Sequence, residues 1–231
     1  MPRTARGLAD GFIYHVLNRG NGGQKVFHKE QDYKAFINLM KKGKDRHPLK
    51  ILAYCLMPNH FHIVVLPTHG EDLSKWMQWL MTSHVRSYHK HYKTSGHVWQ
   101  GRFKSFIVQE ESYLLMLLRY VEGNPVRAGL VSSAKDWQWS SHQARIAGGL
   151  YKLIDEVPIA LPQDWGSYVD KPLRDKELEK LRKSVNRQAP YGEEEWQRKI
   201  CQQLGLESTI RPRGRPTIKK GIKKGTVPFF E

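Results

Sequence analysis

Two histidines, His60 and His62, lie one residue apart in the run LMPNHFHIVVL, which covers residues 56–66 and is otherwise apolar. The run is typical of a buried strand, whose side chains alternate between two faces, so both imidazoles point to the same face. Burying both rings costs stability unless something binds them. A shared metal ion could do so, and two neutral imidazoles alone favour Zn²⁺, Ni²⁺ or Cu²⁺ over Mg²⁺. The spacing leaves a pair of hydrogen-bonded core histidines equally open.

The charge balance favours a polyanionic partner. The chain has 38 Lys and Arg residues against 22 Asp and Glu residues, a formal net charge of +16, which points most simply to nucleic acid. The two cysteines, Cys55 and Cys201, are too few for a disulfide framework and lack a metal-ligand spacing, so we expect reduced thiols in a cytoplasmic protein. No apolar run reaches transmembrane length, and MPRTARGLADG lacks the apolar core of a signal peptide, so no membrane partner is expected.

Apolar periodicity predicts an alternation of strands and helices that fits an α+β domain, with a mostly antiparallel sheet and helices packed on it. The short turn before His60 indicates an antiparallel hairpin. The predicted strands cover 11–19, 51–57 and 60–66, and residues 98–108 are predicted as a further strand or a hairpin. The predicted helices cover 30–46, 72–93 and 110–122.

The chain after this pattern changes in composition. We expect one main domain over 1–165 and a helical appendage over 166–210, with short amphipathic helices at 173–185 and 193–205. A basic tail over 211–231 follows. Between 211 and 225 it has seven cations and no acid, which predicts a DNA-binding tail that is disordered when unbound.

The segment MPNHFHIVV resembles the His-hydrophobic-His motif of the HUH superfamily of single-stranded DNA endonucleases. Further segments resemble its single-tyrosine, IS200-like branch: YHVLNRG at 14–20, VWQGRFKS at 98–105 and YLLMLLRYVEGNPVRAGLV at 113–131. The ordered set, from about 11 to 145, is most similar to the REP-associated tyrosine transposases, and GLESTIRPRGRP also resembles that group. The resemblance implies the ferredoxin- or RRM-like fold of HUH endonucleases and a bacterial, nucleoid-associated protein.

The resemblance also implies a reaction. In the family a tyrosine hydroxyl attacks a DNA phosphate beside a hairpin, leaving a 5′-phosphotyrosine, while Mg²⁺ or Mn²⁺ on the histidines offsets developing charge. The family nucleophile, placed at the start of the helix before the Asn-Pro turn, matches Tyr113 rather than Tyr120. The expected catalytic set is therefore Tyr113, His60 and His62, with both histidines as metal ligands. Related transposons act as dimers, so monomer and homodimer both stay open.

The sequence departs from the family at the third metal ligand. Related enzymes often supply it one turn beyond the tyrosine, where this chain has Met116 and Leu117. Neither side chain suits a hard cation. The remaining candidates are Glu110, Glu111, a polar group from another strand, or water.

Several cations in the family-like motifs are candidate DNA contacts, although exposed surface charge would explain each of them equally well. Trp99 and Phe103 could stack on unpaired bases or pack in the core. In the tail, PRGRP at 212–216 resembles an AT-hook core, whose arginines enter a narrow minor groove. The candidates are Arg19, Arg102, Lys104, Arg127, Arg213 and Arg215.

Two rivals of different classes remain at this point. One is a DNA-binding protein that kept the fold and lost the chemistry, which the missing third ligand favours. The other is a metal hydrolase that uses the same histidines with water as its nucleophile. A labelled DNA product that stays on the denatured protein separates a tyrosine transposase from both.

Removing residues 211–231 should weaken DNA binding but spare cleavage of a short substrate at saturating protein. The change deletes seven cations. If every cation touched a phosphate, the salt slope would fall by roughly six units, at about 0.9 per contact. A flexible arm rarely engages all its charges, so we expect a fall of about three units in salt-titrated binding. A greater loss on A·T-rich than on G·C-rich stems would support minor-groove contact by PRGRP. An unchanged affinity and slope would reject a role for the tail.

Overall fold

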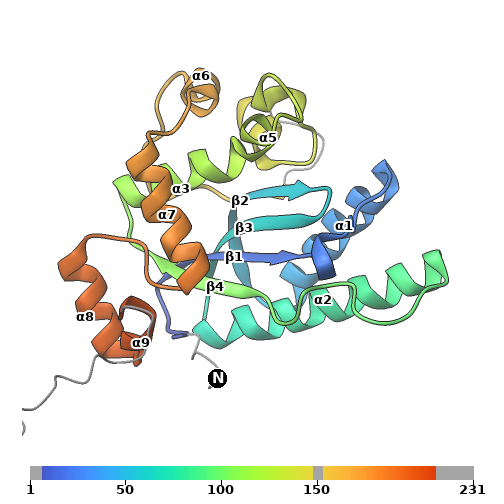
Figure 1. The fold of residues 1–231 in the computed structure, drawn as a ribbon, viewed down its shortest axis with the longest axis horizontal. Coiled ribbons are helices and arrows are strands. Elements are labelled where there is room, and N and C mark those ends of the chain that lie inside the picture. Colours follow the sequence, from blue (N-terminus) through green and yellow to red (C-terminus); the bar gives the residue numbers. More distant parts are fainter. Residues whose placement is uncertain (1–6, 148–152, 212–231) are drawn as a thin grey trace, which may run out of the picture.

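The computed structural model describes residues 7–147 and 153–211. Its centre is a four-stranded antiparallel sheet with the order β2-β3-β1-β4 (Figure 1). Each helical crossover skips one strand position, which gives the split β-α-β arrangement of ferredoxin-like folds. The predicted α+β class is confirmed. The strands are β1 (Ile13–Arg19), β2 (Leu49–Met57), β3 (His60–Pro67) and β4 (Lys104–Val108).

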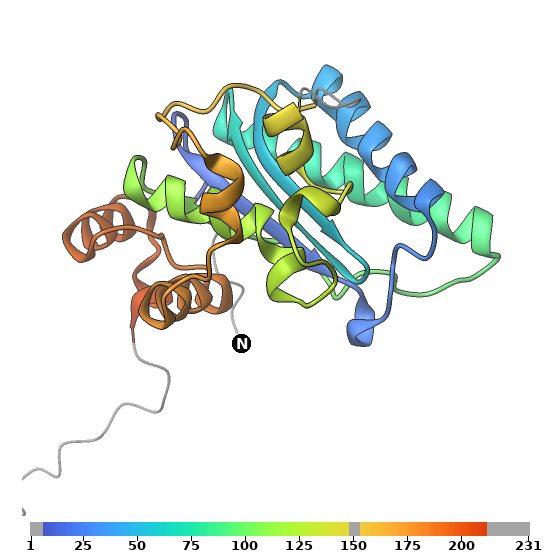
Figure 2. The same cartoon turned by 90° about the horizontal axis from the view of Figure 1, so that it is seen from above.

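Two long helices, α1 (Glu30–Arg46) and α2 (Gly70–Tyr92), cover one face of the sheet (Figure 2). Each has apolar side chains at helical spacing, and these pack with the residues of β1 and β3 that point to this face. Gly43 permits a close approach of the two helices, because a Cβ there would lie 2.7 Å from Nε1 of Trp76. This face is an apolar core with a structural role.

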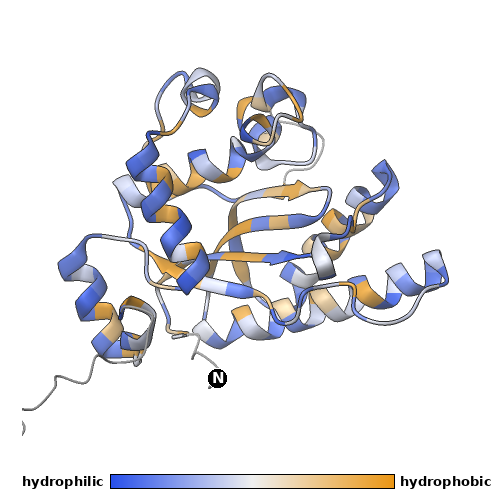
Figure 3. Ribbon diagram, viewed as in Figure 1, coloured by the Kyte–Doolittle hydropathy of each residue, from blue (hydrophilic) through white to orange (hydrophobic). Residues whose placement is uncertain are grey.

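The opposite face is covered by helix α3 and by the segments that follow it (Figure 2). Its core combines Val64 and Phe106 of the sheet with Leu114, Leu117 and Leu118 of α3. In Figure 3, β2 and much of α3 are hydrophobic, β1 and β3 contain hydrophilic stretches, and α7 is mostly hydrophilic. The elements are α3 (Ser112–Glu122), α4 (Asn124–Arg127), α5 (Ser141–Ala147), α6 (Trp165–Asp170), α7 (Asp175–Arg187), α8 (Glu194–Leu204) and α9 (Glu207–Ile210), with 3₁₀ turns η1 (Asn21–Gly23) and η2 (Ala134–Asp136).

The 51–66 hairpin, the predicted helices and the succession of strands and helices along the chain are confirmed, but β4 is shorter than the segment predicted at 98–108. Residues 98–103 form a loop that bonds to the end of β1 instead: Gln100 N donates to Arg19 O at 2.8 Å. The segments after 165 share both cores, through Trp165 and Leu181 on one face and Ile200 on the other. A domain boundary at 165 therefore remains a prediction. No helix in the described ranges is long and apolar enough to cross a membrane.

A buried carboxylate fixes the C-terminal end of α3. Glu122 is fully buried and accepts four hydrogen bonds from side chains of α5 and α6. Burial raises the pKa of Glu122, but the hydrogen bond from His142 and the charge of Arg145 outweigh it and leave that pKa below its usual value. The donors are Ser141 Oγ at 2.6 Å, Trp165 Nε1 at 2.7 Å, His142 Nδ1 at 3.0 Å and Arg145 Nε at 3.0 Å.

Glu122→Ala should destabilise the protein by about 3–5 kcal/mol, because it leaves the buried Arg145 cation without its partner. The lowered pKa of Glu122 means that its contribution is present above about pH 4.5 and is lost as the pH falls through the lower, folded-state pKa. The difference between the parent and the variant in urea unfolding should therefore shrink in acid. Glu194→Ala, which removes an exposed pair with Arg198, is the matched control and should change stability little. An equal effect of both variants would contradict the role of Glu122.

Candidate active site

The two histidines of β3 lie on the sheet face that packs against α3. In the antiparallel register, His60 is opposite Arg19 and His62 is opposite Leu17. Paired residues of an antiparallel ladder share a face, so β1 adds His15, two residues before Leu17, to the same surface. The ring centroids of His60 and His62 are 5.1 Å apart. The predicted common face of the histidine pair is therefore observed.

A third imidazole, His15, supports this pair and was not singled out from the sequence. His15 is fully buried, its ring stacks on His62 with centroids 5.0 Å apart, and its Nε2 lies 2.9 Å from Nδ1 of His62. Alternation along GFIYHVLNR places His15 on the same strand face as Arg19, and this is the feature of the sequence that could have identified His15. Its contact with His62, 47 residues away in the sequence, could not be deduced from that alternation.

The hydrogen bonds of both β3 histidines involve Nδ1. His60 Nδ1 lies 2.7 Å from Oδ1 of Asn59, so the ring donates and carries its proton on that nitrogen. If His62 likewise donates from Nδ1 to His15, both Nε2 atoms have a free lone pair. That tautomer is the one that a metal ligand needs, fixed by a neighbouring hydrogen bond.

The three rings are uncharged at neutral pH. Desolvation by burial lowers the pKa of His15 to about 3 and that of His60 to about 4, and the charges of Arg19 and Arg127 add to the effect on His60. The pKa of His62 is well below its usual value, chiefly through burial and then through the neighbouring histidines. Because a metal ligand must be deprotonated, the burial that makes the pair costly also keeps it ready to bind.

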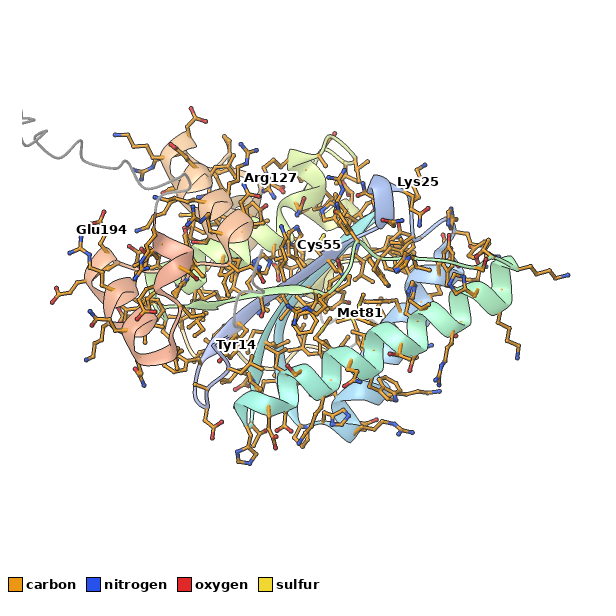
Figure 4. All side chains as sticks on the ribbon, turned by 60° about the horizontal axis from the view of Figure 1, so that its bottom comes forward. Tyr14, Lys25, Cys55, Met81, Arg127 and Glu194 are labelled. Atoms are coloured by element: carbon orange, nitrogen blue, oxygen red, sulfur yellow. The ribbon has the colours of Figure 1, made fainter. Side chains whose placement is uncertain are left out.

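The tyrosine that contacts these histidines is Tyr120. Its ring centroid is 5.6 Å from that of His62, at an interplanar angle of 85°, and 6.5 Å from that of His15. The guanidinium carbon of Arg127 lies 4.1 Å from the centre of the Tyr120 ring, and Arg127 donates to the Tyr120 carbonyl at 3.2 Å. Figure 4 shows Arg127 on this side of the sheet. Tyr120 thus lies between a histidine and a cation.

Tyr113 occupies the other end of α3. It lies seven residues earlier, about 10 Å along the helix axis. Its hydroxyl accepts a hydrogen bond from Lys180 at 2.8 Å, and its ring packs edge-on against Tyr191. Tyr191 is paired with Val108 at the end of β4, whereas His62 is level with the start of β4. The structure therefore brings His60 and His62 together without bringing Tyr113 to them.

The candidates for a third metal ligand also lie at opposite ends of α3. Glu110 and Glu111 are exposed and precede α3, at the Tyr113 end. No cluster of three or more His, Cys, Asp or Glu side chains suited to a metal occurs in the described ranges. Asn124, which is outside that class of ligands, is buried and lies one helical turn beyond Tyr120 at the start of α4. Its amide oxygen suits a hard cation.

Three of the candidate DNA contacts are exposed near the same end of the sheet: Arg19 at the end of β1, Lys104 opposite Leu17, and Arg102 in the preceding loop. Trp99 and Phe103, by contrast, are 4% and 7% exposed and belong to the apolar core. They pack as core residues, and little of either ring is open for stacking on bases. Arg213 and Arg215, with the PRGRP segment, lie outside the described residues.

Comparisons with known proteins give the class of the molecule. The family described as "Transposase IS200 like" matches residues 9–124, half of the chain and the whole sheet. The fold and the sequence thus define a DNA transposase, an enzyme class to which the histidine face and the tyrosine helix are suited. The chain belongs to the IS200-like transposase family.

Within this family, the chain is similar to REP-associated tyrosine transposases. A Haemophilus influenzae protein described as one is 27% identical over 146 residues, covering 58% of this chain and 77% of the relative. An Escherichia coli REP-associated tyrosine transposase is 27% identical over 117 residues, covering 50% of this chain and 67% of the relative. The structure of a REP-associated tyrosine transposase bound to a REP hairpin has a TM-score of 0.54 and 21% identity, covering 76% of this chain and 100% of that one. This structural likeness supports the fold.

Proposed function

We propose that this transposase cleaves single-stranded DNA beside a hairpin and rejoins it through a 5′-phosphotyrosine on Tyr120. The observation that carries the proposal is the edge-on contact between Tyr120 and His62, on the sheet face that also holds His60. A tyrosine in contact with a metal-binding histidine could attack the same phosphate that the metal binds. Tyr113, bonded to Lys180 at the far end of the same helix, has no such neighbour among the described residues.

The proposed metal site consists of His60, His62 and Asn124. With Tyr120 as the nucleophile, the position one turn beyond the tyrosine is Asn124, so the departure noted for Met116 and Leu117 does not arise. Two neutral imidazoles whose Nδ1 atoms are hydrogen-bonded and one amide oxygen would hold a divalent cation, and substrate oxygens and water would complete its shell. The imidazoles alone favour a softer ion, so the choice of Mg²⁺ or Mn²⁺ rests on the family resemblance. Such an ion polarises the scissile phosphate and offsets its charge in the transition state.

The chain's own residues then perform the following steps. The phenol oxygen of Tyr120 attacks phosphorus and loses its proton, the bond from phosphorus to the 3′ oxygen breaks, and that oxygen leaves as a 3′-hydroxyl. Arg127, stacked on the Tyr120 ring, fixes the ring and presents positive charge to the developing anion. Attack by another 3′-hydroxyl on the phosphotyrosine reverses the step, so strand transfer needs no ATP.

DNA would reach this site along the cations at the same end of the sheet. Arg19 lies on β1 opposite His60, Lys104 lies on β4 on the other side of β1, and Arg102 lies in the loop before β4. Binding of a hairpin by the structural relative is in keeping with this. Of the two rivals, a hydrolase would leave Tyr120 without a role. An inactive DNA-binding protein would leave two buried, neutral imidazoles on one strand face, next to Tyr120, without a role.

Tyr120→Phe should abolish the covalent adduct with a labelled hairpin substrate, by at least a hundredfold, and leave folding and DNA binding nearly intact. Tyr113→Phe is the matched control on the same helix. It removes the bond to Lys180, at a cost to stability of about 1 kcal/mol, and should retain the adduct. Denaturing electrophoresis of the protein with end-labelled DNA measures both. An adduct that survives Tyr120→Phe and disappears in Tyr113→Phe would reverse the assignment.

His60→Ala and His62→Ala should each abolish cleavage, as should EDTA, with activity restored by Mg²⁺ or Mn²⁺. His15→Phe should weaken Mn²⁺ binding, measured by calorimetry, by about 10- to 100-fold because His62 loses the bond that orients it. The substitution also leaves the buried Nδ1 of His62 without its partner, so stability should fall by about 1–3 kcal/mol, which urea unfolding measures separately from Mn²⁺ binding. His15→Gln, which can keep a bond to His62, should lose less. Parent-like Mn²⁺ affinity in His15→Phe would reject the orienting role.

A further inference from the structure

A groove on the other side of the sheet remains unexplained by the proposed reaction. It has a volume of about 750 Å³ and lies between α2 and the loop at 96–103. This volume is within the range of small-ligand sites, about 300–1,000 Å³. Figure 4 shows Met81, in the wall formed by α2, on the opposite side of the sheet from Arg127. The groove is therefore separate from the histidine face.

The lining of the groove is apolar within and cationic at the rim. Met77, Met81 and Val85 of α2 face Phe103 across it. Arg86 and Arg102 are exposed at its edge. No aspartate or glutamate contributes to the lining, although the chain has 22 acidic residues. An apolar groove that has two arginines and no carboxylate in its lining suits a flat apolar group that carries a negative charge.

The loop that forms one wall is bonded to the strand that carries the site. Asn21 N donates to Val98 O at 2.9 Å, and Gln100 N donates to Arg19 O at 2.8 Å. Arg19 is in turn opposite His60 in the β1–β3 ladder. Asn18 Nδ2 also donates to Gly101 O at 3.2 Å. The groove therefore opens within a few residues of the reactive end of the sheet.

We infer that this groove binds an unpaired nucleobase of the DNA strand that flanks the cleavage site, with Arg86 and Arg102 on the adjoining phosphates. The inference rests on the proposed function, because it takes single-stranded DNA as the substrate. A nucleobase supplies the flat apolar group and its phosphate the charge, and the backbone bonds above place the pocket beside Arg19. Binding of such a base would position the strand on the histidine face and give the enzyme a preference for flanking sequence.

The test compares a hairpin that has an unpaired flank with the same hairpin lacking it, by anisotropy without divalent cations so that no cleavage occurs. In the parent protein the flank should tighten binding about tenfold, near the lower end of the range for one base stacked on a side chain, because little of the Trp99 and Phe103 rings is open in the groove. Met81→Glu places a negative charge in the groove and should remove most of that gain, while the isosteric Met81→Gln should remove less. Binding of the bare hairpin should change less than twofold in both variants.

The arginine at the rim has a matched control on the same helix. Arg86→Ala should reduce the gain from the flank, and Lys75→Ala, which removes an equal charge from an exposed pair with Glu71, should not. Iodouracil at the bound flank position should crosslink to peptides that contain 77–86 or 96–103. An equal gain in Met81→Glu and the parent, or crosslinks only on other elements, would overturn the inference. If the parent protein formed no covalent adduct but the unpaired flank still tightened binding, the result would count against the proposed chemistry and leave the groove proposal standing.

Discussion

The desolvation of three imidazoles on one face of a β-sheet is the constraint on which the rest of the site depends. His15 and His62 are almost completely buried and His60 is half-buried, and burial holds all three pKa values far below the usual range. Neutral rings can be buried, whereas three imidazolium ions at this spacing could not. The same burial leaves Nδ1 of His15 without a partner in the described structure. A core selected only for stability would place apolar side chains here, so three buried imidazoles on one face are in keeping with the proposed site.

The fold was largely predictable from the sequence because its signals are local. Runs of apolar, β-branched and aromatic residues indicated β1 to β3, helical spacing indicated α1 and α2, and a continuous apolar run indicated the buried helix α3. The prediction was wrong where long-range backbone bonding decided the outcome. Residues 98–103 have strand-like composition, yet their backbone groups bond to the end of β1 as a loop and leave only Lys104–Val108 in the ladder. The donors around Glu122 come from segments without strong periodicity, and no pattern in the sequence joins them to α3.

The histidine pair was predictable for the same local reason, and its surroundings were not. A spacing of two residues in a strand fixes a common face, whereas the choice between Tyr113 and Tyr120 depends on how far α3 runs past the sheet. The helix starts beyond Val108, at the end of β4 distant from His62, so its first turn cannot reach the histidines and its last turn can. If Tyr120 is the nucleophile, the position one helical turn beyond it, where we propose the third ligand, is Asn124, at the start of α4.

The buried Glu122 connects this geometry to the stability of the fold. It lies between Tyr120 and Asn124, and its four hydrogen bonds tie the end of α3 to α5 and α6. A nucleophile must be held to within a fraction of an ångström of its target, and rigid elements do this better than loops. The network costs the burial of a carboxylate and a guanidinium, which apolar packing could replace without loss of stability. Apolar packing could not provide directional hydrogen bonds. The four donors approach one carboxylate from α5 and α6 and fix the rotation of α3 about its axis. That rotation decides which side chain of its last turn faces His62.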